Sequence, residues 1–126
     1  MAEIEAAKIQ LSALWVALML TYLLGDVLRI FSGDFKAGEI QGMRATQQLW
    51  LGIAILMVIP AIMVVLSVTL DNPVNRWANI IVAVVFFAFN LIGLPTYPSV
   101  YDKFLIGVGL VFNAVTVWLA WNWTPR

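Results

Sequence analysis

The sequence IQLSALWVALMLTYLLGDVLRIF at residues 9–31 is an apolar run that contains two ionisable side chains, Asp26 and Arg29. Its length matches the roughly 20 apolar residues that a helix needs to cross a bilayer core of about 30 Å. A charged group in hydrocarbon costs about 2.5–3.5 kcal/mol on insertion scales, so membrane helices keep one for pairing, proton handling or ion contact. The stretch therefore predicts a transmembrane helix that carries the first candidate site.

Three further apolar stretches, at residues 49–70, 77–94 and 104–121, contain no ionisable side chain. Backbone polar groups in lipid must bond within their own segment, which predicts helices. Because the connections are short, we expect an all-α, single-domain bundle of four antiparallel transmembrane helices in up-down-up-down order. Both chain ends then lie on one side, called side A. The connections from the first helix to the second and from the third to the fourth lie on side B.

The composition excludes several classes of protein. Of the 126 residues, 63% are hydrophobic and 11% are charged, and the mean hydropathy is +0.94. A soluble domain is about half apolar and about one-quarter charged. Seven basic residues balance seven acidic ones, so the chain lacks the basic stripe that nucleic acid requires. Without Cys or His we expect no thiol chemistry, no metal site of the usual kind and no cofactor.

The chain start predicts that the first helix is retained. Residues 1–8 carry two acids and one base, whereas a signal peptide begins with a net positive region. We expect a multi-pass protein of the cell (inner) membrane with lipid as a partner. The Lys and Arg residues divide three to side A and four to side B, a difference too small to predict the orientation.

Two of the connections between the predicted helices have a sequence that indicates their structure. Residues 71–76 predict a tight turn in which Pro73 prevents the second helix from continuing. Residues 32–47 are glycine-rich with apolar residues between charges. They are either a short amphipathic piece on the membrane surface or a plain connector.

Matching the helices by depth predicts a polar layer near side B. Its members are Tyr22, Asp26, Arg29, Arg44, Gln47, Asn90, Tyr97 and Tyr101. In one interpretation Asp26 is a proton or cation site open to side B, with Tyr22 and Asn90 as hydrogen-bonding partners. In the other, Asp26 forms a structural pair with Arg29 or Arg44.

A second set of residues lies near the middle of the membrane. Pro60 predicts a kink in the second helix and frees the carbonyl of Leu56, to which Asn113 could donate. Gly107, Gly109 and Asn113 form a small polar strip that favours close helix packing over a substrate site. A thinner layer toward side A contains Ser67, Thr69, Asn79 and Thr116. Because hydroxyls in membrane helices usually bond to their own helix, we assign this layer little functional weight.

Four blocks of sequence carry a resemblance to known proteins. They are TYLLGDV at residues 21–27, TQ at 46–47, ILMVIP at 55–60 and NRWANI at 75–80. With these blocks the chain resembles an uncharacterised family of small bacterial and archaeal integral membrane proteins with four helices. The resemblance implies the four-span topology, draws attention to Tyr22, Asp26, Gln47, Pro60 and Arg76, and brings no activity.

The chain is more loosely similar to small multidrug-resistance transporters, which are also four short helices with an acid in the first. It departs from them because their acid is a glutamate nearer the middle of its span. It also lacks the glycine-rich third helix that they use.

Three functions remain open at this level. The first is a small transporter or channel-like protein with Asp26 as its proton or cation site. The second is a non-catalytic accessory or scaffolding subunit of a larger membrane complex. The third is an enzyme on a lipid-soluble substrate, which would have to use Asp26 with Tyr22 or Tyr97, because we expect no paired carboxylates at one depth. We expect a homo-oligomer or a larger complex, since four short helices enclose little space.

Overall fold

The computed structural model describes residues 5–123 except residues 35, 37, 41–42 and 98. Its long elements are four helices, α1 (Ala6–Ser32), α2 (Gln47–Thr69), α3 (Val74–Gly93) and α4 (Val100–Trp121). Its short elements are the strands β1 (Glu39–Ile40) and β2 (Met43–Arg44) and the 3₁₀ turn η1 (Leu94–Thr96). All four long helices are long and apolar enough to cross a membrane. Each begins earlier than the sequence predicts, and α4 begins at Val100 rather than at residue 104.

The connection between α1 and α2 contains a small β-ribbon, which the sequence analysis did not predict. β1 and β2 pair antiparallel, with Glu39 opposite Arg44. The ribbon follows Gly33, which ends α1 in the left-handed conformation at φ 84°, where glycine has no steric penalty. The prediction of an all-α protein therefore holds for the four long helices and misses this ribbon.

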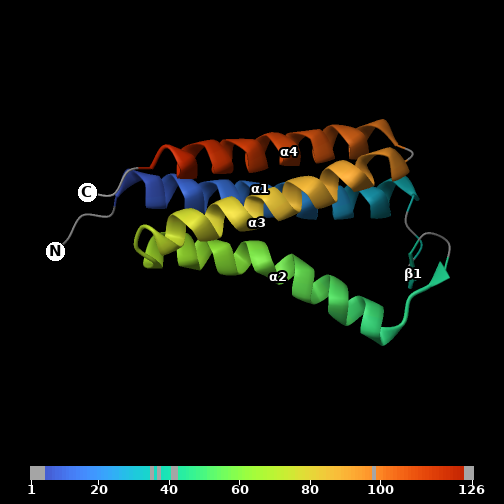
Figure 1. The fold of residues 1–126 in the computed structure, drawn as a ribbon. Coiled ribbons are helices and arrows are strands. Elements are labelled where there is room, and N and C mark those ends of the chain that lie inside the picture. Colours follow the sequence, from blue (N-terminus) through green and yellow to red (C-terminus); the bar gives the residue numbers. More distant parts are fainter. Residues whose placement is uncertain (1–4, 35, 37, 41–42, 98, 124–126) are drawn as a thin grey trace.

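The four helices lie alongside one another, and α2 diverges from the others along its first half (Figure 1). α1 packs against both α2 and α4, and α4 packs against α3. By contrast, α2 and α3 make few contacts. The hydrogen bonds between these two helices lie near side A, where Asn75 and Asn79 bond to Ser67. The side B halves of α2 and α3 are therefore separated.

Pro60 lies at the buried centre of α2. A proline inside a helix removes one N–H donor and pushes away the carbonyl four residues earlier. The first half of α2 leaves the bundle (Figure 1). The predicted bond from Asn113 to the Leu56 carbonyl is not formed, and neither polar atom of the Asn113 side chain has a partner in the described part of the chain. The prediction failed because α4, which carries Asn113, packs on α1 and α3 and not closely on α2.

The glycines of α4 differ in what they face. A Cβ built on Gly109 would lie 3.4 Å from Cδ1 of Leu18 and 3.6 Å from Cε1 of Tyr22, so this glycine allows α1 to approach closely. A Cβ on Gly107 would meet no described atom within 4 Å. Of the predicted small strip, Gly109 serves packing within the chain and Gly107 does not.

One apolar cluster lies between α1, α2 and α3, and its buried members are Trp15, Leu18, Met63, Ala83 and Phe86. A second cluster joins α1, α3 and the end of α4, and its buried members are Leu11, Ile80, Ala120 and Trp123. The rings of Trp15 and Phe86 meet edge to face with centroids 6.0 Å apart, a preferred arrangement of aromatic pairs.

A saturated amide network closes the bundle toward side A. The Asn79 side-chain oxygen accepts from Nε1 of Trp15 at 2.6 Å and from Oγ of Ser67 at 3.3 Å. Its amide nitrogen donates to the backbone oxygen and to Oδ1 of Asn75, at 3.0 and 2.6 Å. The Asn75 amide donates in turn to the carbonyls of Ser67 and Leu70. These bonds join three helices in the buried interior.

The polar residues toward side A therefore form two kinds of hydrogen bond, within one helix and between helices. Thr69 and Thr116 bond to carbonyls of their own helices, as expected. Ser67 and Asn79 instead join different helices, because Asn79 is long enough to reach the Trp15 ring of α1.

Arg76 has a structural position at the same end. It donates to the carbonyls of Ala120 and Trp121 at 3.0 and 2.9 Å, so it satisfies free carbonyls at the end of α4. Its guanidinium also lies 5.3 Å from the ring centres of both Trp77 and Trp121.

Two of the buried asparagines, Asn79 and Asn113, predict opposite effects on stability. Asn113 is 1% exposed and its amide has no partner in the described chain. Leaving a buried polar group unpaired costs about 1–3 kcal/mol. We therefore expect Asn113→Leu to raise the free energy of unfolding by roughly this amount, measured by denaturant titration in detergent micelles.

The matched control is Asn79→Leu, the same change at a saturated amide. It should lower the free energy of unfolding, because Trp15 and Ser67 would each lose a partner. If Asn113→Leu destabilised the protein as much as Asn79→Leu, the Asn113 side chain would have to be bonded, and the structural account of it would be wrong.

Candidate functional site

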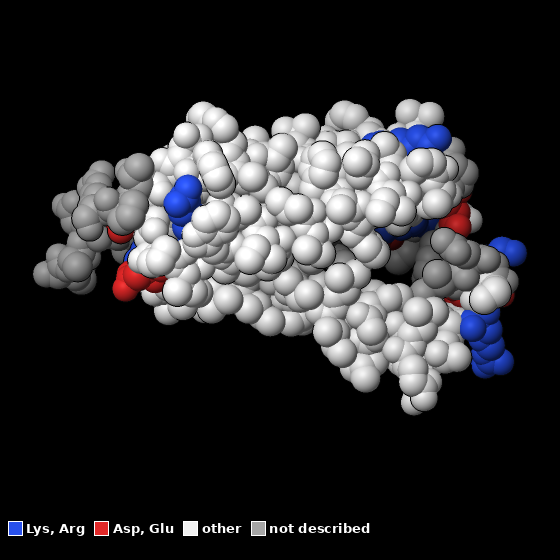
Figure 2. Space-filling view, viewed as in Figure 1, with Lys and Arg blue, Asp and Glu red and all other residues white. Residues whose placement is uncertain are grey.

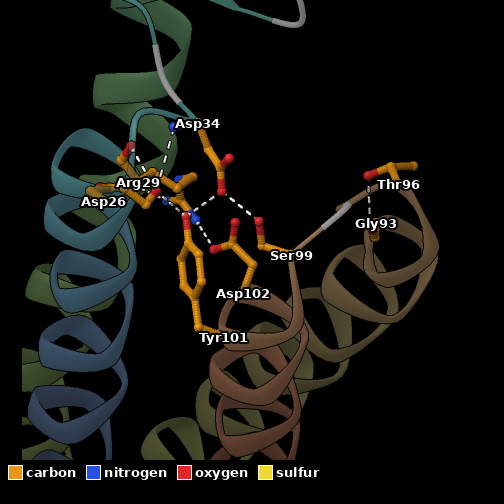
Figure 3. Close-up of polar contacts among 9 residues, drawn as sticks. Asp26, Arg29, Asp34, Gly93, Thr96, Ser99, Tyr101 and Asp102 are labelled. Atoms are coloured by element: carbon orange, nitrogen blue, oxygen red, sulfur yellow. Dashed lines mark hydrogen bonds and ion pairs between the residues drawn. The ribbon is translucent and has the colours of Figure 1, made fainter.

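Three charged side chains meet where the end of α1 faces the start of α4. Nη1 of Arg29 lies 2.5 Å from Oδ1 of Asp102, and Nη2 bonds to Oδ1 of Asp26 (Figure 3). The Asp102 side chain is 2% exposed, that of Arg29 25% and that of Asp26 54%. One guanidinium therefore bridges a buried and an exposed carboxylate, and the cluster has one net negative charge when both acids are ionised.

Local features of both helices position this cluster. Asp26 and Arg29 are three residues apart on α1, a spacing that makes side chains neighbours on a helix surface. Asp102 lies in the first turn of α4, where the helix dipole favours a negative charge. A Cβ on Gly25 would lie 3.4 Å from Nη1 of Arg29, so the absence of a side chain there leaves room for the guanidinium.

The cluster lines a cavity of about 200 Å³ that all four helices enclose. Its polar wall contains Thr21, Tyr22, Asp26, Arg29, Asn90, Tyr97 and Asp102. Its apolar wall contains Leu56, Met57, Val85, Phe86, Phe89, Leu105 and Ile106. Figure 2 shows the surface hollowed on the side B half of this face, and it shows charged residues gathered toward the two ends with an uncharged surface between them.

Tyr22 and Asn90 bond to each other and not to Asp26. Nδ2 of Asn90 donates to the Tyr22 hydroxyl at 2.6 Å and to the carbonyl of Phe86 at 2.9 Å. Both residues line the cavity, so the sequence analysis placed them in the right layer. The prediction that they are partners of Asp26 was wrong, because these two side chains bond to each other, while Oδ1 of Asp26 bonds to Arg29.

Arg44 and Gln47 were predicted in the same layer, and the structure does not bring them there. Arg44 lies in β2 and Gln47 is the first residue of α2, and both are exposed. Neither belongs to the described cavity lining, and the ion pair of Asp26 in the described chain is with Arg29. The prediction matched residues by depth alone and did not allow for the divergence of α2.

The two tyrosines near side B have separate positions. The Tyr97 ring lies in the cavity wall, with its centre 5.8 Å from Cζ of Arg29. The Tyr101 hydroxyl instead donates to Oδ2 of Asp34 at 2.6 Å and lies 2.7 Å from Oγ of Ser32. Tyr101 therefore belongs to the contact between α1 and α4 outside the cavity.

Asp34 connects the two helices at this end. It accepts a hydrogen bond from Ser99 at 2.5 Å as well as the one from Tyr101 (Figure 3). These bonds, with Ser99 first, hold the pKa of Asp34 below its ordinary value, because they stabilise the ionised carboxylate. The folded-state pKa is the lower one, so this contribution is present above the ordinary pKa and is lost as the pH falls through the lowered pKa.

Asp102 is the residue that the sequence analysis missed. Residue 102 precedes the predicted fourth segment, which begins at residue 104, and no paired carboxylates were predicted at one depth, whereas Asp26 and Asp102 share Arg29. The signal was the pattern SVYD at residues 99–102, a Ser followed three residues later by an acid, which marks a helix start. In the structure neither side chain caps the helix, because Ser99 bonds to Asp34 and Asp102 bonds to Arg29.

The buried carboxylate predicts how the cluster responds to mutation. Arg29→Met would leave Asp102 buried and unpaired. We expect it to lower the free energy of unfolding by about 2–3 kcal/mol, less than the roughly 3–5 kcal/mol of a fully buried pair because Arg29 is partly exposed. Denaturant titration at pH 7 measures the loss.

The control is the double variant Arg29→Met/Asp102→Asn. It removes the stranded charge, so it should recover part of the stability that Arg29→Met loses. A double variant that is less stable than Arg29→Met would contradict the assignment of Asp102 as a buried ionised group.

Comparison with known proteins identifies a family. No curated protein and no solved structure matches the chain. The family model that matches is described as a family of unknown function (DUF6326), and it covers residues 2–125. This agrees with the resemblance to an uncharacterised family, and the match includes the whole charged cluster. Since the model extends over nearly the entire sequence, the chain belongs to the DUF6326 family of unknown function.

Proposed function

We propose that this protein is a small transporter or channel-like membrane protein whose proton or cation site is the cluster of Asp26, Arg29 and Asp102. The observation that supports the proposal is that two carboxylates and one guanidinium line a single cavity between the helices. Ionisable residues inside membrane segments are costly and characteristically mark ion or substrate pathways. Asp26 alone was the predicted site, and the proposal now includes Asp102.

The charges of the site favour a cation. Arg29 directs two of its nitrogens at the two acids, which leaves one net negative charge at the cavity wall when both are ionised. A cation that contacts both carboxylates removes this charge. The other titratable groups that line the cavity are the phenols of Tyr22 and Tyr97. A proton and a cation would therefore compete for the same two carboxylates.

The proposal includes the threading of the chain through the cell (inner) membrane. The four helices would cross in alternating directions, with the loops near the charged cluster on side B. In this arrangement the exposed apolar residues of the four helices would face lipid, and the cluster would lie close to one membrane surface.

The second candidate is a non-catalytic subunit of a larger membrane complex, or a homo-oligomer. It is supported by Gly107, which lies on α4 with open space in front of it. A small residue on an uncovered membrane helix allows a neighbouring helix to approach closely. In this case the charged cluster would hold α1 and α4 together and would not bind a mobile ion.

The first proposal predicts ion movement that depends on Asp102 and Asp26. Purified protein is reconstituted in liposomes that contain a pH-sensitive dye, and a potassium gradient with valinomycin sets the membrane potential. With a panel of cationic solutes outside, we expect solute-dependent proton movement. Asp102→Asn and Asp26→Asn should each reduce this movement at least tenfold, because each removes one of the two competing carboxylates.

The matched control is Asp71→Asn. Asp71 pairs with Lys8 at the opposite end of the bundle and is exposed, so this variant should keep the movement of the parent. If the parent moved neither protons nor cations at either polarity, the transport proposal would fail.

The second candidate predicts that self-association depends on Gly107. Mass measurement in native nanodiscs should show an oligomer for the parent, and Gly107→Leu should shift the protein toward the monomer by blocking close approach. Gly52→Leu, at another glycine with open space but on α2, is the control and should leave the mass unchanged. A parent that is strictly monomeric would contradict the homo-oligomer.

A further inference from the structure

We propose that the cavity binds an alkylammonium group carried on an apolar chain, and that this ligand enters from the bilayer through the gap between α2 and α3. The inference deepens the proposed function, because it names the class of cation that the carboxylates would bind. It concerns equilibrium binding, so it can be tested without measuring transport.

Two carboxylate oxygens at the cavity are free acceptors. Oδ1 of Asp26 and Oδ1 of Asp102 bond to Arg29, whereas the Oδ2 atoms of both make no hydrogen bond to any residue that the structure describes. Both residues line the cavity. An ammonium group has N–H donors and a positive charge, so it satisfies such oxygens and neutralises the cluster. A carboxylate ligand would add a second net negative charge at a wall where Arg29 is already paired.

An apolar wall lies opposite these acids. Met57 of α2 and Val85, Phe86 and Phe89 of α3 line the same cavity. A small hydrated inorganic cation gains nothing from such side chains, because it would lose water without replacing it. A ligand whose charged group continues into a carbon chain matches both walls of the cavity.

The volume of the cavity limits how much of the ligand it can hold. A cavity of about 200 Å³ is somewhat larger than the roughly 150 Å³ of an engineered cavity that binds benzene. It is smaller than the roughly 300–1,000 Å³ of sites that enclose a drug-sized ligand. The cavity therefore holds the ammonium group and the first part of its chain, and the rest of a longer chain must lie outside.

The route of entry lies between α2 and α3. α2 and α3 are in contact near side A, while the first half of α2 diverges from the bundle (Figure 1). Val85 and Phe89 line the cavity and are also 59% and 61% exposed on α3. The mouth of the cavity is thus apolar and lies along a helix that is long and apolar enough to cross a membrane. In the bilayer this mouth faces hydrocarbon, where an alkyl chain resides.

The experiment is photolabelling in phosphatidylcholine nanodiscs. The probe is a dodecylammonium that carries a diazirine on its chain, and unlabelled dodecylammonium is the competitor. We expect saturable labelling that maps to α2 and α3 around Met57, Val85 and Phe89, and at least a tenfold loss with Asp102→Asn. Diazirine probes with a carboxylate or an alcohol head should give no saturable labelling at these positions.

A second variant keeps the test decisive if Asp102→Asn does not fold. Val85→Trp fills the mouth and leaves the charged cluster intact, so it should reduce saturable labelling at least tenfold. Ile81→Trp is the matched control, because Ile81 lies one turn earlier on α3, is 60% exposed and is outside the described cavity lining. It should label like the parent.

A further arm distinguishes two sources of the alkylammonium group. Nanodiscs that include phosphatidylethanolamine offer the same group on a lipid headgroup. Loss of labelling in them would identify the lipid as an occupant, and unchanged labelling would identify a free amine, and both results support the proposal. Equal saturable labelling by the carboxylate or alcohol probe would overturn the proposal. So would labelling at other positions that is unchanged in Val85→Trp.

The outcome also separates this inference from the transport proposal. Saturable binding without ion movement would uphold the ligand class and reject transport. Movement of small cations without labelling at the cavity would reject the ligand class and uphold transport.

Discussion

The bond between Arg29 and Asp102 is the constraint on which the side B half of the molecule depends. Asp102 is almost completely buried, and an ionised carboxylate in that position requires a partner. The partner comes from a helix 73 residues away in sequence, so the bond fixes the end of α1 against the start of α4. Because these two helices are held together there, the divergence of α2 opens a cavity rather than separating the whole bundle.

The two ends of the bundle use polar groups in contrasting ways. Toward side A, Asn79 forms four hydrogen bonds that connect three helices, and the helices are in contact. Toward side B, the carboxylates of Asp26 and Asp102 each have one oxygen without a described partner, and a cavity lies beside them. Saturated networks rigidify a core, whereas free acceptors beside a cavity are available to a ligand. The side A end is therefore closed by its hydrogen bonds, whereas the side B end keeps acceptors that face a cavity.

The sequence was sufficient to predict the four apolar helices and to place Asp26 and Arg29 side by side on the first of them. Hydropathy reports how long an apolar run is, and a spacing of three residues places two side chains together on any helix. Asp102 was missed because its position depends on where α4 begins, and element boundaries are the least certain feature of a sequence-based prediction. Arg44 and Gln47 were misplaced for another reason. Matching residues by depth predicts their position along the bundle axis but not their lateral position. The direction in which α2 leaves the bundle depends on packing.

The residual charge of the cluster also separates the candidate functions on physical grounds. With both acids ionised, Asp26, Arg29 and Asp102 carry one uncompensated negative charge in a partly buried place. In a transporter the compensating cation must be exchangeable, so both Oδ2 atoms have to remain accessible from the cavity. In a fixed subunit one carboxylate would be enough to pair with Arg29, and the half-exposed Asp26 would add little to the contact between α1 and α4. A second carboxylate on the same guanidinium therefore favours a site whose occupant changes.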